Sequence, residues 1–372
     1  MQNKTQKKIV LIPPGGNLIK QDFSLIRIAE YFEEKNIQTY LLQINEIPNN
    51  KEDTFTDFVI NVKDKKELFN YLKNNTFDLI FHRTWMHRYQ FAASIAEDFQ
   101  NVAIYIKDWH SGDHIEEYQF LYDTVEDYDG IERVFKSNAL ILSHFTEDQL
   151  EIWDKTYQIN KNNFHYFPEM CSKKRFSYKQ RDYKIQPKLA YAGSLFSTAQ
   201  PNDMTPGKSF FRQLMKMSSN HKVNLFLLPY LYDKVMNNNL AYQDYQFENK
   251  FNKNFTINKG ENLGYSLLDD FQFGIQVDAY IKEDSIYSKY SKNAITSKLS
   301  FYLEAGLPII INKNLTAFSQ IVSEHNIGLV YDDHDLDDFD RVLRISKEDY
   351  EKLRCNIYQF REKFSYNDIT MK

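Results

Sequence analysis

The stretch NAITSKLSFYLEAGLPIIIN, residues 293–312, decides the fold class of this chain. Thr296 or Ser297 is suited to cap the start of a helix, because a short hydroxyl side chain can accept hydrogen bonds from the first free amides. Gly306 stands where a left-handed C-terminal cap belongs. The apolar run Ile309–Ile311 that follows is typical of a buried parallel strand. The stretch therefore predicts a short helix that returns the chain into an α/β sheet.

Short apolar runs alternate with helical segments on both sides of this stretch, so the α/β pattern extends over the chain. Strands are predicted at residues 9–12, 38–44, 78–81, 102–106, 139–142 and 163–167, and again at 189–192, 223–228, 255–259, 273–277, 307–312 and 329–331. Two consecutive series of similar length predict two doubly wound, Rossmann-like domains that face each other across a cleft.

The domain boundaries are predicted from local composition. Residues 171–187 are rich in Lys and Arg and poor in aliphatic side chains, so we interpret them as an interdomain linker. We therefore expect an N-terminal domain over residues 1–180 and a C-terminal domain over residues 181–346. Residues 347–372 are expected to contribute a C-terminal helix that could return to the N-terminal domain.

Composition excludes several classes of protein. The 372 residues are 42% hydrophobic and 26% charged, which is ordinary for globular domains. The net charge of -5 argues against a nucleic-acid partner. The two cysteines, Cys171 and Cys355, form no metal-ligand or disulfide pattern. Only four apolar residues, Ile9–Ile12, precede the first turn, too few for a signal peptide, and no apolar run is long enough to span a bilayer. We expect a cytoplasmic protein, with contact at the inner face of the membrane left open.

The start of the helix near Ser297 has the properties of an anion site. Free backbone amides and the helix dipole favour negative charge there, and Lys298 adds a full positive charge. Glu304 follows Ser297 by seven residues, so both face nearly the same way, roughly 10 Å apart along the axis. This spacing suits a nucleoside diphosphate, with ribose near the carboxylate. An ordinary surface helix with one Lys and one Glu explains the spacing equally well.

The same stretch resembles the donor-site signature of GT-B glycosyltransferases, especially those of retaining family 4. The matching positions are Ser297, Lys298, Leu299, Glu304, Ala305, Gly306, Pro308 and Ile309. The resemblance implies that Glu304 binds the ribose and that the Ser297–Lys298 turn binds the diphosphate of a nucleotide-sugar. Many family members carry another glutamate eight residues earlier, where this chain has Thr296. The resemblance therefore implies neither the contact with the donor sugar nor the stereochemistry of transfer for this chain.

Residues 189–195, LAYAGSL, resemble the strand end that opens the donor domain of these enzymes. The resemblance assigns Gly193 and Ser194 to the donor site, with Ser194 in place of the usual Arg. Lys208 is the candidate for the missing cation, and Arg212 is the reserve. A solvated lysine at a helix start is the alternative for Lys208.

Two further loops are assigned by the resemblance. Gly260 and Glu261 follow a predicted strand at the place where these folds receive the nucleobase. Gly15, Gly16 and Asn17 follow the first strand and resemble the glycine-rich loop that faces the diphosphate and acceptor. Glycines there would let the backbone approach a ligand closely.

Asp108 and His110 follow the predicted strand 102–106 at the expected ligand edge of the sheet. Family 4 enzymes often carry a His at this place, so either residue could contact the sugar or act as a base. A hydrogen-bonded loop histidine is the alternative for His110. His82 and Arg83 end the preceding strand and could bind the acceptor, although packing or a salt bridge is the favoured interpretation.

The sequence as a whole predicts a glycosyltransferase that moves sugar from a UDP- or GDP-type donor to a saccharide or lipid-linked acceptor in surface polysaccharide or glycoconjugate synthesis. No cofactor or metal is expected, because the Asp-x-Asp patterns at 127–129 and 335–337 follow no convincing strand. A UDP-sugar 2-epimerase of the same fold, or a non-catalytic binding protein for sugar nucleotides or glycans, remains an alternative. Oligomeric state is left open.

Overall fold

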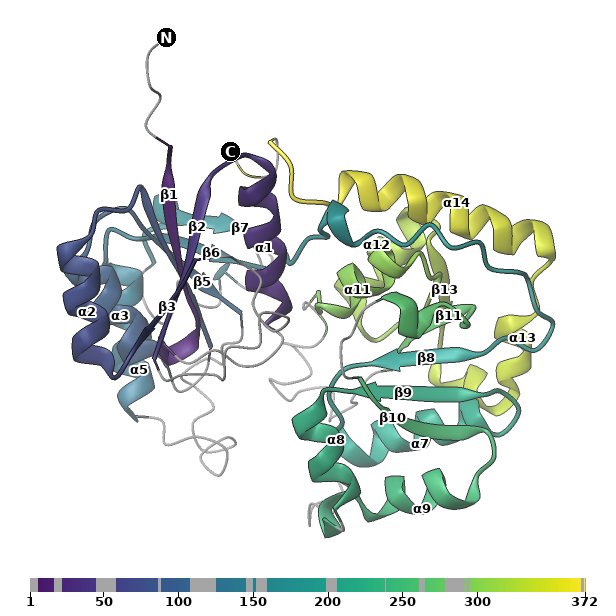
Figure 1. The fold of residues 1–372 in the computed structure, drawn as a ribbon. Helices are drawn as coiled ribbons and strands as arrows, with labels where there is room; N and C mark the ends of the chain where they lie inside the picture. Colours follow the sequence, from purple (N-terminus) through teal and green to yellow (C-terminus); the bar gives the residue numbers. More distant parts are fainter. Residues whose placement is uncertain are drawn as a thin grey trace. The chain divides into compact units, whose positions relative to one another are not determined.

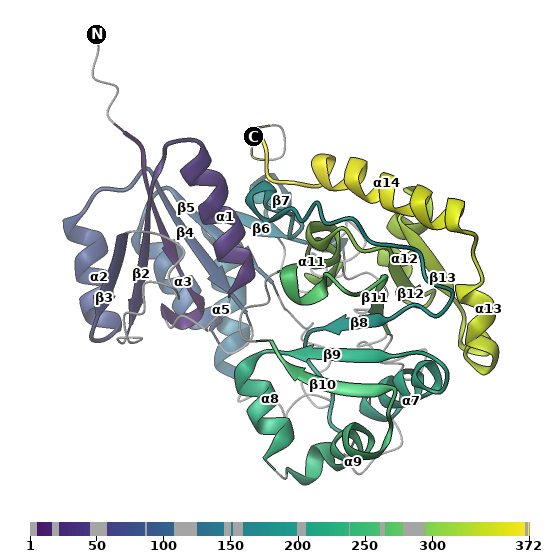
Figure 2. The ribbon, with the colours of Figure 1, turned by 45° about the vertical axis from the view of Figure 1, so that its right-hand side comes forward.

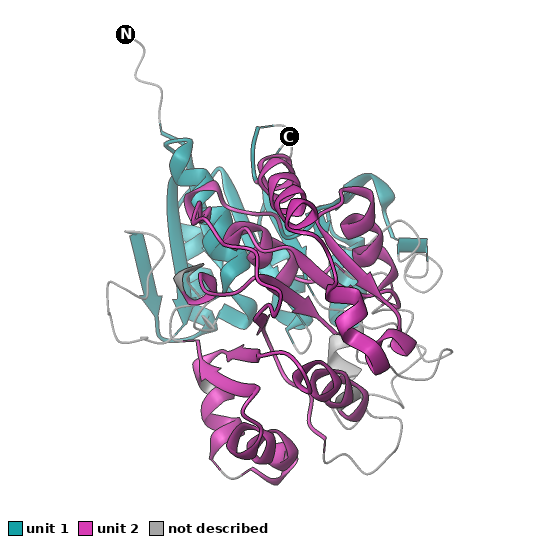
Figure 3. Cartoon of the chain, turned by 90° about the vertical axis from the view of Figure 1, so that its right-hand side faces the viewer, with its two compact units in different colours: residues 1–169, 366–372 teal, residues 170–365 magenta. Residues whose placement is uncertain are grey.

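A computed structural model of the chain describes residues 6–16, 22–44, 58–85, 88–107, 125–144, 150–151, 159–198, 206–237, 239–260, 265–277, 292, 295–368 and 371. It divides into two compact units (Figure 3). Unit 1 comprises residues 1–169 and 366–372, and unit 2 comprises residues 170–365. The chain therefore passes between the units twice, and unit 2 is one continuous segment inserted between the two parts of unit 1.

Unit 1 is built on a seven-stranded parallel sheet with the order β3-β2-β1-β4-β5-β6-β7. Its strands are β1 (Lys8–Ile12), β2 (Gln38–Ile44), β3 (Phe58–Val62), β4 (Leu79–Thr84), β5 (Val102–Ile106), β6 (Leu140–Ser143) and β7 (Phe164–Tyr166). Its main helices are α1 (Phe23–Glu34), α2 (Lys65–Asn74), α3 (Tyr89–Asp98) and α5 (Val125–Lys136). Figure 1 shows α1 on one face of the sheet and α2, α3 and α5 on the other. Both faces are therefore covered, which is why β5 is apolar throughout and β1 is apolar after Lys8.

Unit 2 contains a six-stranded parallel sheet with the order β10-β9-β8-β11-β12-β13. Its strands are β8 (Leu189–Ala192), β9 (Val223–Leu227), β10 (Phe255–Lys259), β11 (Phe273–Gln276), β12 (Ile309–Asn312) and β13 (Gly328–Tyr331). Its helices are α7 (Pro206–Ser218), α8 (Pro229–Met236), α9 (Gln243–Phe251), α11 (Lys298–Ala305), α12 (Thr316–Glu324), α13 (Phe339–Leu343) and α14 (Lys347–Lys363). The two doubly wound sheets confirm the predicted fold class. Within the described part of the chain, no helix has the length and apolar character needed to cross a membrane.

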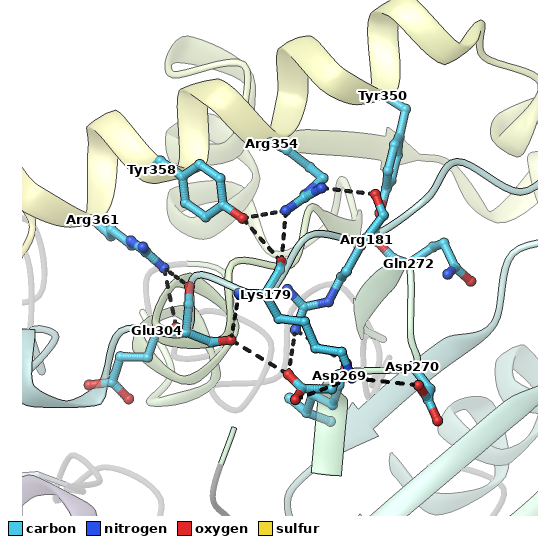
Figure 4. Close-up of polar contacts among 12 residues, drawn as sticks. Lys179, Arg181, Asp269, Asp270, Gln272, Glu304, Tyr350, Arg354, Tyr358 and Arg361 are labelled. Atoms are coloured by element: carbon cyan, nitrogen blue, oxygen red, sulfur yellow. Dashed lines mark hydrogen bonds and ion pairs between the residues drawn. The ribbon is translucent and has the colours of Figure 1, made fainter. Parts of the chain in front are cut away.

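The Lys/Arg-rich segment 171–187 was expected to be a linker but belongs to unit 2. Figures 1 and 2 both show it running along α14, and Figure 4 shows the contacts. Arg354 Nη1 donates to the Arg181 carbonyl at 2.9 Å, and Arg361 Nη1 donates to the Ser177 carbonyl at 2.8 Å. The segment is held through its backbone carbonyls and not through aliphatic side chains. Its composition therefore gave no indication that it packs along α14. The division accordingly falls after residue 169, where 180 was expected, and α14 is counted with unit 2.

Candidate functional site

The end of β8 and the start of α11 meet at the carboxyl edge of the unit 2 sheet, where ligands bind in doubly wound folds. Lys298 Nζ lies 5.2 Å from the centroid of the Tyr191 ring. Gly193 lies next to both side chains, and its φ of 147° is rarely adopted by other residues. A Cβ at Gly193 would lie 2.6 Å from Lys298 Cε. Glycine is therefore required for the lysine side chain to lie across the strand end. The structure thus brings together the end of β8 and the start of α11, which the sequence assigned to one site.

Two tyrosine hydroxyl groups fix the backbone at this strand end. The Tyr302 hydroxyl donates to the Ile275 carbonyl at 2.8 Å and accepts from the Ala192 amide at 3.1 Å, which joins β11 to β8. Burial raises the pKa of the Tyr302 phenol, so it stays protonated and can donate. The Tyr191 hydroxyl donates to the Ser194 carbonyl at 2.6 Å. Sequence reasoning missed both roles, since a tyrosine in an apolar run looks like an ordinary core residue.

The first residues of α11 differ from the predicted cap. Ser297 occupies the N-cap position with φ -54° and ψ -16°, a helical conformation, and its side chain makes no capping hydrogen bond. The buried Thr296 Oγ1 likewise has no hydrogen-bond partner among the described residues. The expectation that one of these hydroxyls caps the helix is therefore wrong, because a cap needs a non-helical backbone at that residue. The C-terminal prediction is confirmed: Gly306 is left-handed, with φ 69°.

Glu304 lies in the last turn of α11 and is fully buried inside unit 2. Its Oε1 accepts a hydrogen bond from the Ser172 amide at 2.8 Å, and its carbonyl accepts from the Ser177 amide at 2.8 Å. The predicted ribose carboxylate is thus also an anchor for the segment that begins unit 2. Its ribose contact stays a prediction.

We expect Glu304→Ala to lower the free energy of unfolding by about 1–3 kcal/mol, because the buried Ser172 amide loses its acceptor. Glu304→Gln is the matched control, since its side-chain oxygen can still accept that hydrogen bond. Urea unfolding of the three proteins measures the difference. Equal stability of the alanine and glutamine variants would show that the Ser172 bond does not stabilise unit 2.

The other donor-site candidates of unit 2 lie on three separate elements. Lys208 is exposed in the first turn of α7, and Ser194 is exposed beside Gly193. Gly260 is buried at the end of β10, and its amide donates to the Leu227 carbonyl at 2.7 Å. Strand β9 separates β10 from β8, but the ends of all three share one edge of the sheet. Asn17, Asp108, His110 and Glu261 lie outside the described residues.

The glycine-rich turn of unit 1 is a packing requirement of the fold. Gly15 and Gly16 have φ values of 62° and 80°, in the left-handed region. A Cβ on Gly15 would lie 2.7 Å from Arg88 Cδ, and one on Gly16 would lie 2.7 Å from Ile44 Cδ1. Close packing within unit 1 therefore explains both glycines, and their approach to a ligand stays a prediction.

The interpretation of His82 and Arg83 as structural is confirmed. Arg83 Nη1 lies 2.7 Å from Asp22 Oδ2 in a buried salt bridge. His82 is completely buried, and its Nδ1 lies 3.0 Å from the Ile12 carbonyl oxygen. Burial lowers the pKa of His82 to about 3, so the imidazole is neutral at physiological pH.

A buried ionic cluster beside this salt bridge escaped sequence reasoning. Glu169 Oε1 lies 2.8 Å from Arg27 Nη1, and its Oε2 lies 3.0 Å from Lys107 Nζ. Burial alone would raise the pKa of Glu169, but these two cations lower it to about 2. Glu169 is the last residue before the chain enters unit 2, so the cluster anchors that end of unit 1.

These pKa values predict acid sensitivity. His82 titrates near pH 3 when folded and near 6.5 when unfolded, so the unfolded state takes up the proton first. Its stabilisation is complete above pH 6.5 and is lost as the pH falls towards 3. We expect wild type to lose about 2 kcal/mol more than His82→Gln between pH 7 and pH 5. Urea unfolding at both pH values measures this.

The exposed His165 provides the control, and His165→Gln should retain the wild-type pH dependence. Glu169 titrates lower, between about 4.5 and 2, and does not contribute in this range. An unchanged pH dependence in His82→Gln would show that another group causes the acid sensitivity.

The two Asp-x-Asp patterns have structural contacts. Asp335 Oδ2 accepts from the Asp332 amide at 2.8 Å in a capping box, and Asp129 Oδ2 accepts from Gln90 Nε2 at 3.0 Å. The described residues contain no group of three or more His, Cys, Asp or Glu side chains that could hold a metal ion.

Comparison with known proteins gives one family match. Residues 229–372 match the family model of the glucosyltransferase 3-like C-terminal domain. That region contains the whole of α11 and the strands on either side of it. No curated protein matches the chain.

Several solved structures are similar over nearly the whole chain. WaaG, a glycosyltransferase involved in lipopolysaccharide biosynthesis, is 14% identical with a TM-score of 0.58, covering 98% of this chain and 96% of that one. An α-glucosyltransferase in complex with UDP is 12% identical with a TM-score of 0.63, covering 99% and 100%. HepE from Anabaena, in complex with UDP-glucose, is 10% identical with a TM-score of 0.63, covering 96% and 95%. The chain therefore has the GT-B fold of these glycosyltransferases, and over residues 229–372 it resembles the C-terminal domain of the glucosyltransferase 3-like family.

Proposed function

We propose that this protein transfers a sugar from a UDP- or GDP-type nucleotide-sugar to a saccharide or lipid-linked acceptor, in the synthesis of a surface polysaccharide or other glycoconjugate. The observation that carries the proposal is the position of Lys298, at the start of α11 and across the end of β8. The match of residues 229–372 to a glucosyltransferase domain supports it. We propose that the protein acts in the cytoplasm, and at the inner face of the membrane when the acceptor is a lipid.

In the proposed reaction, the bond between the donor sugar and the diphosphate breaks, and negative charge accumulates on the departing nucleoside diphosphate. The Lys298 ammonium and the amides at the start of α11 stabilise that charge, so no metal ion is required. Glu304 binds the ribose, and Gly260 and Glu261 receive the base. Lys208 and Ser194 complete the phosphate environment beside Gly193.

Unit 1 provides the acceptor side in this proposal. The turn formed by Gly15, Gly16 and Asn17 faces the diphosphate and acceptor. Asp108 or His110 contacts the sugar or removes the proton from the acceptor hydroxyl. The anomeric configuration of the product shows whether the reaction is retaining or inverting.

A binding screen followed by a turnover assay tests the proposal. Thermal unfolding is measured with UDP, GDP, CMP and their sugars, and UDP-glucose is tested first because HepE binds it. We expect one nucleoside diphosphate to raise the melting temperature. The turnover assay measures release of that nucleotide from its nucleotide-sugar. A higher rate of release when saccharides or lipids from a cell extract are added would support transfer. Release of free 2-epimerised sugar would instead identify an epimerase, and binding without turnover would identify a sugar-nucleotide-binding protein. No stabilisation by any nucleotide would refute the donor site.

A further inference from the structure

Tyr191 lies directly beneath the cation on which the proposed function depends. Lys298 Nζ is 5.2 Å from the centroid of its ring, within the range of a cation–π interaction. The Tyr191 side chain is only 1% exposed, and its ring packs edge-on against Phe210 with 5.3 Å between centroids. The aromatic face that meets the ammonium is therefore fixed by the core of unit 2.

The other end of the same side chain holds the neighbouring turn. The Tyr191 hydroxyl donates to the Ser194 carbonyl at 2.6 Å, and Ser194 itself is exposed. Gly193 lies between the two contacts and leaves room for Lys298 Cε, which a Cβ would approach to 2.6 Å. One buried residue thus contacts both groups that are proposed to face the diphosphate.

We propose that Tyr191 is a positioning residue for the diphosphate: its ring holds the Lys298 ammonium over the end of β8, and its hydroxyl fixes the Gly193–Ser194 turn beside it. The inference rests on the proposed function, because it assumes that Lys298 binds a diphosphate. Holding the long lysine side chain before the ligand arrives reduces the conformational entropy lost on binding. A ring face attracts an ammonium less strongly than a phosphate does, so a diphosphate can compete with the ring for the Lys298 ammonium.

A double-mutant cycle tests the inference, with UDP and GDP titrated calorimetrically in parallel. We expect Lys298→Met to weaken binding of the preferred nucleotide about 10- to 100-fold and Tyr191→Leu to weaken it about three- to tenfold. When Lys298 is already Met, Tyr191→Leu should lose only the roughly two- to threefold that the missing hydroxyl causes, because the ring no longer has an ammonium to hold. A purely structural role for Tyr191 would lower the affinity by the same factor in both backgrounds, which would overturn the inference.

Tyr191→Phe is the conservative variant and protects the test against a folding defect in Tyr191→Leu. It keeps the ring and removes only the hydroxyl, so we expect a loss of about two- to threefold, as for one neutral hydrogen bond. A loss as large as that caused by Tyr191→Leu would show that the ring contact contributes nothing.

A measurement without nucleotide tests the contact itself. Lysines are reductively methylated with ¹³C-formaldehyde, which keeps their charge, and the Lys298 signal is identified by its absence in Lys298→Arg. We expect a ring-current shift of that signal in wild type and in Tyr191→Phe, and its loss in Tyr191→Leu. An unshifted wild-type signal would refute the inference while leaving the proposed function intact. Failure of wild type to bind either nucleotide would refute both.

Discussion

Replacement of Lys298 by alanine is expected to weaken UDP or GDP binding by about 10- to 100-fold and to slow donor turnover at least as much. The ammonium lies at the start of α11, so it adds to the helix dipole and the free amides there. Its loss removes a charge-assisted hydrogen bond to the diphosphate. Isothermal titration with the nucleotide that stabilises wild type measures the effect directly.

The matched control for this substitution is Lys347→Ala. Lys347 is an exposed lysine on α14 whose ammonium lies 3.7 Å from Glu351, one turn away on the same helix. Its removal changes the net charge by the same amount, so the affinity should stay within about twofold of wild type. The difference in nucleotide affinity between the two variants should become smaller at high salt, because screening weakens the attraction between the Lys298 ammonium and the diphosphate. Equal affinities of Lys298→Ala and wild type would remove Lys298 from the site.

Arg361→Ala is expected to lower the free energy of unfolding by about 3–5 kcal/mol. The guanidinium is buried between the rings of Phe176, Tyr178 and Tyr358, at 4.3, 4.6 and 4.5 Å from their centroids. It also donates to the carbonyls of Ser177 and Glu304, and Figure 4 labels Arg361 and Glu304. Alanine removes the cation–π contacts and leaves both carbonyls without this donor.

Two other variants of α14 show whether the effect belongs to the buried guanidinium. Arg361→Lys keeps the charge but loses the planar group that stacks on the rings, so we expect an intermediate loss. Lys363→Ala changes an exposed residue at the end of the same helix and should alter stability by less than about 0.5 kcal/mol. Urea unfolding measures all three. A loss below about 1 kcal/mol in Arg361→Ala would show that the segment 171–187 is held by other contacts.

The strands of both sheets were largely predictable because buried parallel strands require continuous apolar runs. The exception, β3, combines the exposed Phe58 with the polar Asn61, so its sequence lacks that pattern. The segment 171–187 was misread for the opposite reason. Its backbone carbonyls accept hydrogen bonds from Arg354 and Arg361, which follow the segment by some 180 residues. Local composition carries no sign of such contacts.

The candidate site was predictable only where a residue type is obligatory. Gly306 and Gly193 have positive φ values that other residues rarely adopt, so their positions in the pattern were informative. A serine before a helix is compatible with many backbone conformations, and the predicted capping hydrogen bond of Ser297 is not formed. Tyr191 and Lys298 are separated by 106 residues, and their contact depends on the pairing of β8 with β11. No local spacing could have shown that the cation rests on an aromatic ring.

The interrupted sequence of unit 1 has a consequence for synthesis on the ribosome. Tyr366 stacks on Phe167 with 5.6 Å between ring centroids, and Asp368 accepts from the Tyr31 hydroxyl at 3.0 Å. These partners of the early-made helix α1 and of Phe167 are translated only after residues 170–365. The first unit to emerge from the exit tunnel is therefore the last to acquire its full set of contacts, and during translation it must persist without them.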